Sequence, residues 1–105
     1  MTDILNRLAV IVASRADADP SESHTAALIA KGRAKIAEKV GEEAIETVIA
    51  AVQNDRDALI AESADLLFHL SVLWAHAGIS PSDVDAELAR REGVSGIAEK
   101  AGRTR

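Results

Sequence analysis

One short polar segment, Asn54-Asp55, separates two long stretches of helical hydrophobic spacing, and it constrains the fold more than any other feature of the chain. Asn tolerates left-handed backbone angles and Asp is a favourable N-cap, so one helix can end and another begin at this point. No segment has the alternating pattern of a strand. The sequence therefore predicts an all-α fold based on a helical hairpin, a bundle of about four helices.

The remaining helix boundaries come from apolar spacing and from capping residues. Gly78 can end a helix, while Ser80 and Pro81 can begin the next one, with Asp83 as the capping-box partner. The expected helices are Ile4 to Ala13, about Thr25 to Gln53, about Arg56 to Ala77, and Pro81 to about Arg91.

The expected second helix has glycines in its interior and too many apolar residues for one buried face. Gly32 and Gly41 each cost about 1 kcal/mol of helix stability relative to Ala. Because Gly41 directly precedes an acidic cluster, we expect another helix or a ligand to approach the backbone there. Ile45, Ile49 and Val52 lie outside the core stripe, which predicts a second buried face and completion of the bundle by dimerisation.

Composition limits the classes of protein and of site. With 105 residues we expect one domain at 1–91 and a mobile, glycine-rich arm at 92–105. A net charge of −5 and 2% aromatic residues argue against nucleic-acid binding. The chain has no cysteine, which excludes disulfides and thiolate metal sites. No leader segment or membrane span is expected, so we predict a soluble, cytoplasmic protein.

Two acidic clusters flank the hairpin turn. Glu42, Glu43 and Glu46 precede it, and Glu62 and Asp65 follow it. Counting outward from the turn at 1.5 Å per residue, Glu46 and Glu62 lie at roughly 12 Å and Glu43 and Asp65 at roughly 17 Å. We therefore expect the two clusters to face each other across the hairpin.

Facing carboxylates can be two solvated helix surfaces, or they can be ligands of a hard divalent cation such as Mg²⁺. The Glu-x-x-His motifs of bundle di-iron sites are absent. The histidines, His24, His69 and His76, do not have the spacing of a catalytic zinc site. His69 lies one turn beyond Asp65, where it can orient a carboxylate, contact a substrate, or be an ordinary boundary histidine.

Four further residues are candidates for contacts with a phosphorylated substrate. Lys35 and Lys39 lie on the same charged stripe as Glu42 and Glu46, although ordinary surface lysines would look the same. Ser23 and Thr25 precede an apolar run, where they can receive a phosphate or simply cap the helix.

These residues have the pattern of a known superfamily. Glu42-Glu43-x-x-Glu46 followed by Glu62-x-x-Asp65 resembles the motif of the all-α nucleoside triphosphate pyrophosphohydrolases, the MazG-like superfamily. The surrounding residues most resemble the phosphoribosyl-ATP pyrophosphohydrolases over about residues 4 to 91. The matching segments are Ser23-His24-Thr25, Leu28, Gly32, Lys35-Ile36, Lys39 to Ala44, Glu46, and Ala64 to Leu70.

The resemblance implies hydrolysis of phosphoribosyl-ATP to phosphoribosyl-AMP and pyrophosphate, the second step of histidine biosynthesis, with Mg²⁺ or alternatively Mn²⁺. It implies that Glu43, Glu46, Glu62 and Asp65 hold the metal, while Glu42 is a base, an outer ligand or a partner of Lys39. The chain has His24 where the family tends to have another aromatic residue, and Phe68 where it tends to have Tyr. A cyclohydrolase, sometimes fused, uses the product, and this short chain is expected to lack that domain.

Two other functions remain open at this point. The chain could hydrolyse a different nucleoside triphosphate, or it could be a helical dimerisation module without activity. If the chain is a phosphoribosyl-ATP pyrophosphohydrolase, its expected partners are a small-molecule substrate and a second copy of the chain. No nucleic acid and no membrane are expected as partners.

Overall fold

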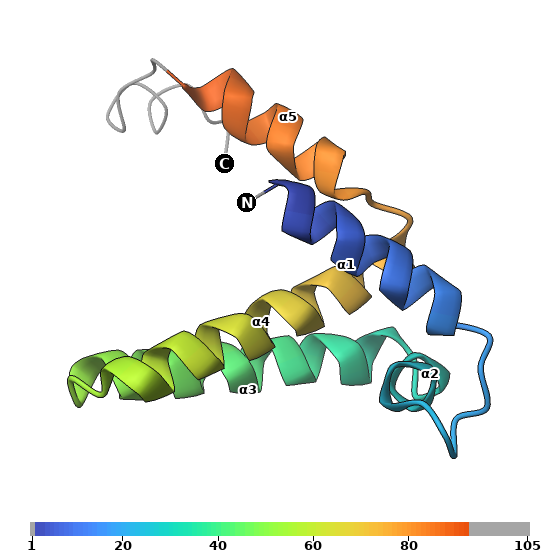
Figure 1. Ribbon diagram of the computed structural model, residues 1–105, viewed down its shortest axis with the longest axis horizontal. Helices are drawn as coiled ribbons and strands as arrows, with labels where there is room; N and C mark the ends of the chain where they lie inside the picture. Colours follow the sequence, from blue (N-terminus) through green and yellow to red (C-terminus); the bar gives the residue numbers. More distant parts are fainter. Residues whose placement is uncertain (1, 93–105) are drawn as a thin grey trace.

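The computed structural model describes residues 2–92, and within them every regular element is a helix (Figure 1). This confirms the predicted all-α class, with five helices in place of about four. The helices are α1 (Thr2–Arg15), α2 (His24–Ala30), α3 (Arg33–Val52), α4 (Arg56–Ala77) and α5 (Pro81–Arg91).

The hairpin predicted around Asn54-Asp55 consists of α3 and α4, which lie side by side along most of their length (Figure 1). Asn54 has a φ of 58°, the left-handed conformation that asparagine tolerates. The Asp55 side chain accepts a hydrogen bond from the Ala58 amide at 3.1 Å and so caps α4. Local turn chemistry therefore sets the hairpin.

The predicted helix from Thr25 to Gln53 is wrong in one respect, because the chain breaks at Gly32. Gly32 has a φ of +94° and is the N-cap of α3, so α2 and α3 are separate helices. A φ of this size cannot continue an α-helix, and glycine adopts it without a steric penalty. In Figure 1, α2 turns away from the axis of α3 at the open end of the hairpin.

Gly41, by contrast, is in the middle of α3 and exposed, and a Cβ added there would meet nothing within 4 Å. Within residues 2–92 no other helix approaches Gly41, and the alternative, approach of a ligand there, stays a prediction.

The remaining helices form a second layer against the hairpin. α1 packs against α4, and α5 lies beside α1 with the opposite direction (Figure 1). The predicted boundary before α5 is confirmed: Gly78 has a φ of 74°, and Ser80 and Asp83 form a capping box. α1 ends at Arg15, two residues later than expected.

The fully buried core is small and lies where α1, α2, α3 and α4 meet. Its members are Val12, Leu28, Ile36 and Val72, with Leu8, Ile29, Phe68 and Leu73 packed against them. Further along α3, four large apolar side chains at helical spacing are exposed. They are Ile45 at 63%, Val48 at 61%, Ile49 at 48% and Val52 at 76%, and we call them the α3 apolar face.

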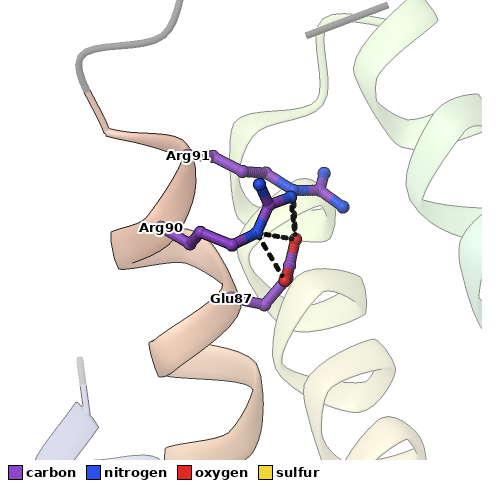
Figure 2. A network of polar contacts seen from close by, with 3 residues as sticks. All are labelled: Glu87, Arg90 and Arg91. Carbon is purple, nitrogen blue, oxygen red and sulfur yellow. Dashed lines mark hydrogen bonds and ion pairs between the residues drawn. The ribbon is translucent and has the colours of Figure 1, made fainter. Parts of the chain in front are cut away.

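One charged cluster on α5 is unrelated to the hairpin. The Glu87 carboxylate accepts hydrogen bonds from Arg90 Nη2 at 2.6 Å and from Arg91 Nε at 2.9 Å (Figure 2). The hydrogen bond from Arg90, followed by that from Arg91, lowers the pKa of Glu87 to about 2. This carboxylate is therefore ionised and paired at neutral pH.

One expectation is not tested by the structure, and another needs a correction. The predicted arm at 92–105 lies outside the described residues except for Glu92, so the boundary at residue 91 stays a prediction. The expectation that no apolar segment is long enough for a membrane needs a correction, since α4 has 22 residues and is largely apolar. By length and composition alone this helix is long enough to cross a membrane, as are the core helices of many soluble proteins.

A candidate metal centre between the hairpin helices

The facing acidic clusters predicted from the sequence meet in the structure. Glu43 on α3 and Glu62 and Asp65 on α4 each offer a carboxylate oxygen, and these three oxygens lie within 4.8 Å of one another. Helical spacing explains the pair on α4, since residues three apart share a face. The antiparallel hairpin then brings Glu43 to the same height as this pair.

Two oxygens in this cluster have no hydrogen-bond partner. Glu43 Oε2 and Glu62 Oε2 are both buried and unpaired. A buried polar atom without a partner costs about 1–3 kcal/mol, and more when it is charged, so such atoms are rare unless they bind something. Carboxylate oxygens from three residues are also the ligands that hard divalent cations prefer. The donor set therefore fits a metal ion.

Glu62 has the most perturbed carboxyl group of the cluster. A hydrogen bond with the Glu46 carboxyl, a second with that of Glu43, and burial raise the pKa of Glu62 to about 7. Because a bound cation favours the ionised form of a carboxyl group, metal binding would lower the pKa of Glu62 and displace its proton. Glu46 thus lies against Glu62, as the equal heights predicted, and both line a cavity of about 210 Å³.

The nearby lysines pair with other glutamates. Lys39 Nζ lies 3.5 Å from Glu42 Oε1, and Lys35 Nζ lies 3.3 Å from Glu38 Oε1. Glu42 was expected to be a base, an outer ligand or a partner of Lys39, and in the structure it forms the ion pair with Lys39. Within residues 2–92, no ion pair with lysine or arginine is found for Glu43, Glu62 or Asp65.

Ser23 caps α2, as the simpler interpretation predicted, whereas Thr25 lies inside the helix and is buried. The Ser23 hydroxyl accepts a hydrogen bond from the Ala26 amide at 3.1 Å, and its residue is the N-cap of α2. Thr25 is only 3% exposed.

His69 is buried, with 8% of its surface exposed. Its Nδ1 lies 2.8 Å from the Asp65 carbonyl oxygen, so Nδ1–H donates and the tautomer is fixed. The ring is therefore held against the same turn of α4 that presents the Asp65 carboxylate.

The chain was compared with known proteins. Residues 5–92 match the family model described as phosphoribosyl-ATP pyrophosphohydrolase. The chain belongs to this family. All of the candidate site residues lie within the matched range.

Curated relatives with the name phosphoribosyl-ATP pyrophosphatase agree with this assignment. The protein of Rhizorhabdus wittichii is 60% identical over 103 residues, which cover 98% of this chain and 97% of that protein. That of Paramagnetospirillum magneticum is 56% identical, with coverages of 97% and 94%. That of Granulibacter bethesdensis is 55% identical, and the match covers 97% of this chain but only 64% of that longer relative. Membership of the phosphoribosyl-ATP pyrophosphohydrolase family also makes the chain one of a family of hydrolases.

The sequence analysis missed a ring cluster next to the acidic site. The rings of His24, Phe68 and His69 come together from α2 and α4. Phe68 follows Asp65 by three residues, and this spacing was a visible signal that it shares a face with the acidic pair. The contact with His24 depends on how α2 turns at Gly32, which the sequence analysis did not predict.

Proposed function

We propose that this member of the family hydrolyses phosphoribosyl-ATP to phosphoribosyl-AMP and pyrophosphate, the second step of histidine biosynthesis. The family match supports the reaction class. The structural observation that most supports it is the convergence of Glu43, Glu62 and Asp65, with two buried oxygens that lack partners. A triphosphate substrate needs cationic neutralisation, and this cluster is suited to recruit it.

The proposed metal ligands are Glu43, Glu46, Glu62 and Asp65, and the proposed ion is Mg²⁺, with Mn²⁺ as the alternative. When bound, such an ion supplies neutralisation of phosphate charge and a lower pKa for a coordinated water. Ionised Glu43, Glu62 and Asp65 would hold it, because their oxygens lie within 4.8 Å of one another. Glu46 lies against Glu62, where its carboxylate would complete the ligand set.

The other proposed roles belong to residues around the cluster. Glu42 would accept a proton from water or support the ligands, and Lys39 would exchange Glu42 for a substrate phosphate. Lys35 would bind phosphate in the same way, since the side chains of Lys35 and Lys39 are 40% and 37% exposed and free to reorient. Substrate contacts by Ser23, Thr25 and His69 stay predictions. The hydrogen bond of His69 to Asp65 favours a positioning role for this ring.

The test is release of pyrophosphate from phosphoribosyl-ATP by the purified protein, with Mg²⁺ and with a chelator, beside a panel of ordinary nucleoside triphosphates. We expect Mg²⁺-dependent release and a strong preference for phosphoribosyl-ATP. Glu46→Ala should abolish turnover while far-UV circular dichroism stays that of a helical protein. Full turnover by this variant would refute the metal assignment. Preference for another triphosphate would refute the substrate assignment.

We also propose that the protein is a homodimer through the α3 apolar face. Ile45, Val48, Ile49 and Val52 have the i, i+3, i+4, i+7 spacing of a helix that packs on another helix, yet they are exposed. Burying each such side chain contributes about 1.5–3 kcal/mol. Val48→Glu combined with Ile49→Glu should give a monomer in sedimentation velocity, while Leu88→Glu, at an exposed position on α5, should not. A wild-type monomer would contradict this proposal.

We propose a cytoplasmic location. Glu62 and Asp65 lie within α4, and carboxylates there would be costly in a bilayer. Recovery of the native protein in the membrane fraction after lysis would contradict this proposal.

A further inference from the structure

A second cavity opens at the middle of α4, where Phe68 lies one helical turn beyond Asp65. It has a volume of about 380 Å³, and its lining includes Arg15, Ser23, His24 and Phe68. It lies between the end of α1, the following loop, the start of α2 and the middle of α4. This volume is in the range of small-molecule sites, which are commonly apolar with a few polar groups.

Two of the lining rings have nearly parallel planes. The rings of His24 and Phe68 are 24° from parallel, with centroids 6.3 Å apart. His69 stands edge-on to both, at 83° to His24 and 85° to Phe68. Because Nδ1–H of His69 is bonded to the Asp65 carbonyl oxygen, the orientation of the His69 ring against the other two is fixed. Two nearly parallel ring faces are what a flat heteroaromatic ligand can contact together.

The cavity is close to the metal-binding carboxylates along one face of α4. Phe68 follows Asp65 by three residues, so the two side chains are neighbours on the helix surface. A ligand with its phosphates at Glu43, Glu62 and Asp65 therefore has the ring pair within the next helical turn. Such a ligand has a flat base at one end and phosphates at the other, which is the form of a nucleotide.

We propose that this cavity holds the purine ring of the substrate against the faces of Phe68 and His24. The inference rests on the proposed function and adds to it the residues that recognise the base. Phe68 provides an apolar face fixed by the core, and exposed His24 provides a second flat surface at the entrance. The acidic cluster and the ring pair thus bind different parts of one molecule.

Binding of adenosine 5′-monophosphate tests the cavity without metal and without turnover. Titration calorimetry in the presence of a chelator should show binding to the wild type. His24→Ala and Phe68→Leu should weaken it by about 5-fold to 150-fold, the range for loss of one stacking contact. His24→Phe should retain binding, because it keeps a flat ring at the same place. Asp17→Asn, in the same loop but not in the cavity lining, is the matched control and should bind as the wild type does.

Steady-state kinetics with phosphoribosyl-ATP provides the second readout. We expect His24→Ala to raise KM with kcat nearly unchanged, since the ring contacts the base and not the reacting phosphate. Binding of Mg²⁺ with inorganic tripolyphosphate should be the same in the wild type and in His24→Ala. If Phe68→Leu loses helicity, the comparison of His24→Ala with His24→Phe remains sufficient.

The outcomes separate this inference from the proposed function. If phosphoribosyl-ATP is hydrolysed normally but KM and nucleotide binding are the same in His24→Ala and wild type, the inference is overturned and the function stands. Failure of the wild type to bind the monophosphate at millimolar concentration also overturns it. If the wild type does not hydrolyse phosphoribosyl-ATP, the function fails, and the binding experiment still decides whether a purine occupies the cavity.

Discussion

Glu62 and Glu87 are glutamates of one chain with opposite electrostatic surroundings. Glu87 on α5 is held by Arg90 and Arg91, which lower its pKa to about 2 (Figure 2). Glu62 on α4 lies against the carboxyl groups of Glu46 and Glu43, and its pKa rises to about 7. Within residues 2–92, the chain therefore pairs a carboxylate with arginines on α5 but gathers carboxylates without a lysine or arginine partner in the hairpin.

This difference concerns positive charge, which Glu87 has beside it and the hairpin cluster does not have within residues 2–92. Ion pairs such as that of Glu87 with its arginines are ordinary on a protein surface, and each contributes little to stability. Gathering Glu43, Glu46 and Glu62 is unfavourable in the free protein because like charges repel. Such an arrangement is expected where a cation from solution completes the site, so the hairpin cluster is the functional region of the two.

The largest expected effect is on activity. Glu62→Gln keeps the shape of the side chain but removes its charge, and it should lower kcat/KM for phosphoribosyl-ATP by about 100-fold or more, since a bound metal supplies several kcal/mol to the transition state. Glu87→Gln should leave kcat/KM within about twofold of wild type, because a surface substitution usually changes little. Pyrophosphate release measures both. Equal losses in the two variants would remove the distinction between the regions.

The next effect is on the pH dependence of stability without metal. Because the folded-state pKa of Glu62 is raised from 4.5 to about 7, its contribution is fully present below pH 4.5 and is lost as the pH rises through 7. Glu87 has the opposite sign, since its contribution is present above pH 4.5 and is lost as the pH falls through about 2. Urea unfolding in the presence of a chelator should show that the free energy of unfolding decreases as the pH rises through 7. Glu62→Gln should abolish this decrease. An unchanged profile in Glu62→Gln would show that another group causes the decrease.

The smallest effect is expected for the arginines of α5. Arg91→Ala removes one of the two arginines that bind Glu87, and we expect a change of at most about 0.5 kcal/mol in the free energy of unfolding, as for most exposed ion pairs. Urea unfolding at neutral pH measures it. A loss of several kcal/mol would mean that α5 depends on this cluster more than its exposure indicates.

Much of the fold was predictable because its signals are local. Asn54-Asp55 and the segment from Gly78 to Asp83 contain the residues that turns and caps require, and both boundaries are confirmed. The break at Gly32 was not predicted because a glycine inside a helical pattern does not by itself show whether φ will be positive. No helix within residues 2–92 approaches Gly41, because the position of a glycine in the sequence does not show what packs against it.

The site was predictable to the extent that it depends on the hairpin. Glu43, Glu62 and Asp65 meet because two straight helices and a short turn fix their heights. The ring contact of His24 with Phe68 depends on the path of α2 after α1, a tertiary feature without a local signal. Sequence spacing also left the partner of Glu42 open, and only side-chain geometry gave the pair with Lys39.

The most direct test of the metal site is Mg²⁺ binding measured at pH 7 by calorimetry in buffers of different ionisation enthalpy. With the pKa of Glu62 at about 7, the wild type should bind Mg²⁺ and release about half a proton per site. Glu62→Gln should bind far more weakly and release none, while Glu87→Gln should match the wild type. Equal Mg²⁺ affinity and equal proton release in the wild type and Glu62→Gln would contradict the assignment of the hairpin cluster as the metal site.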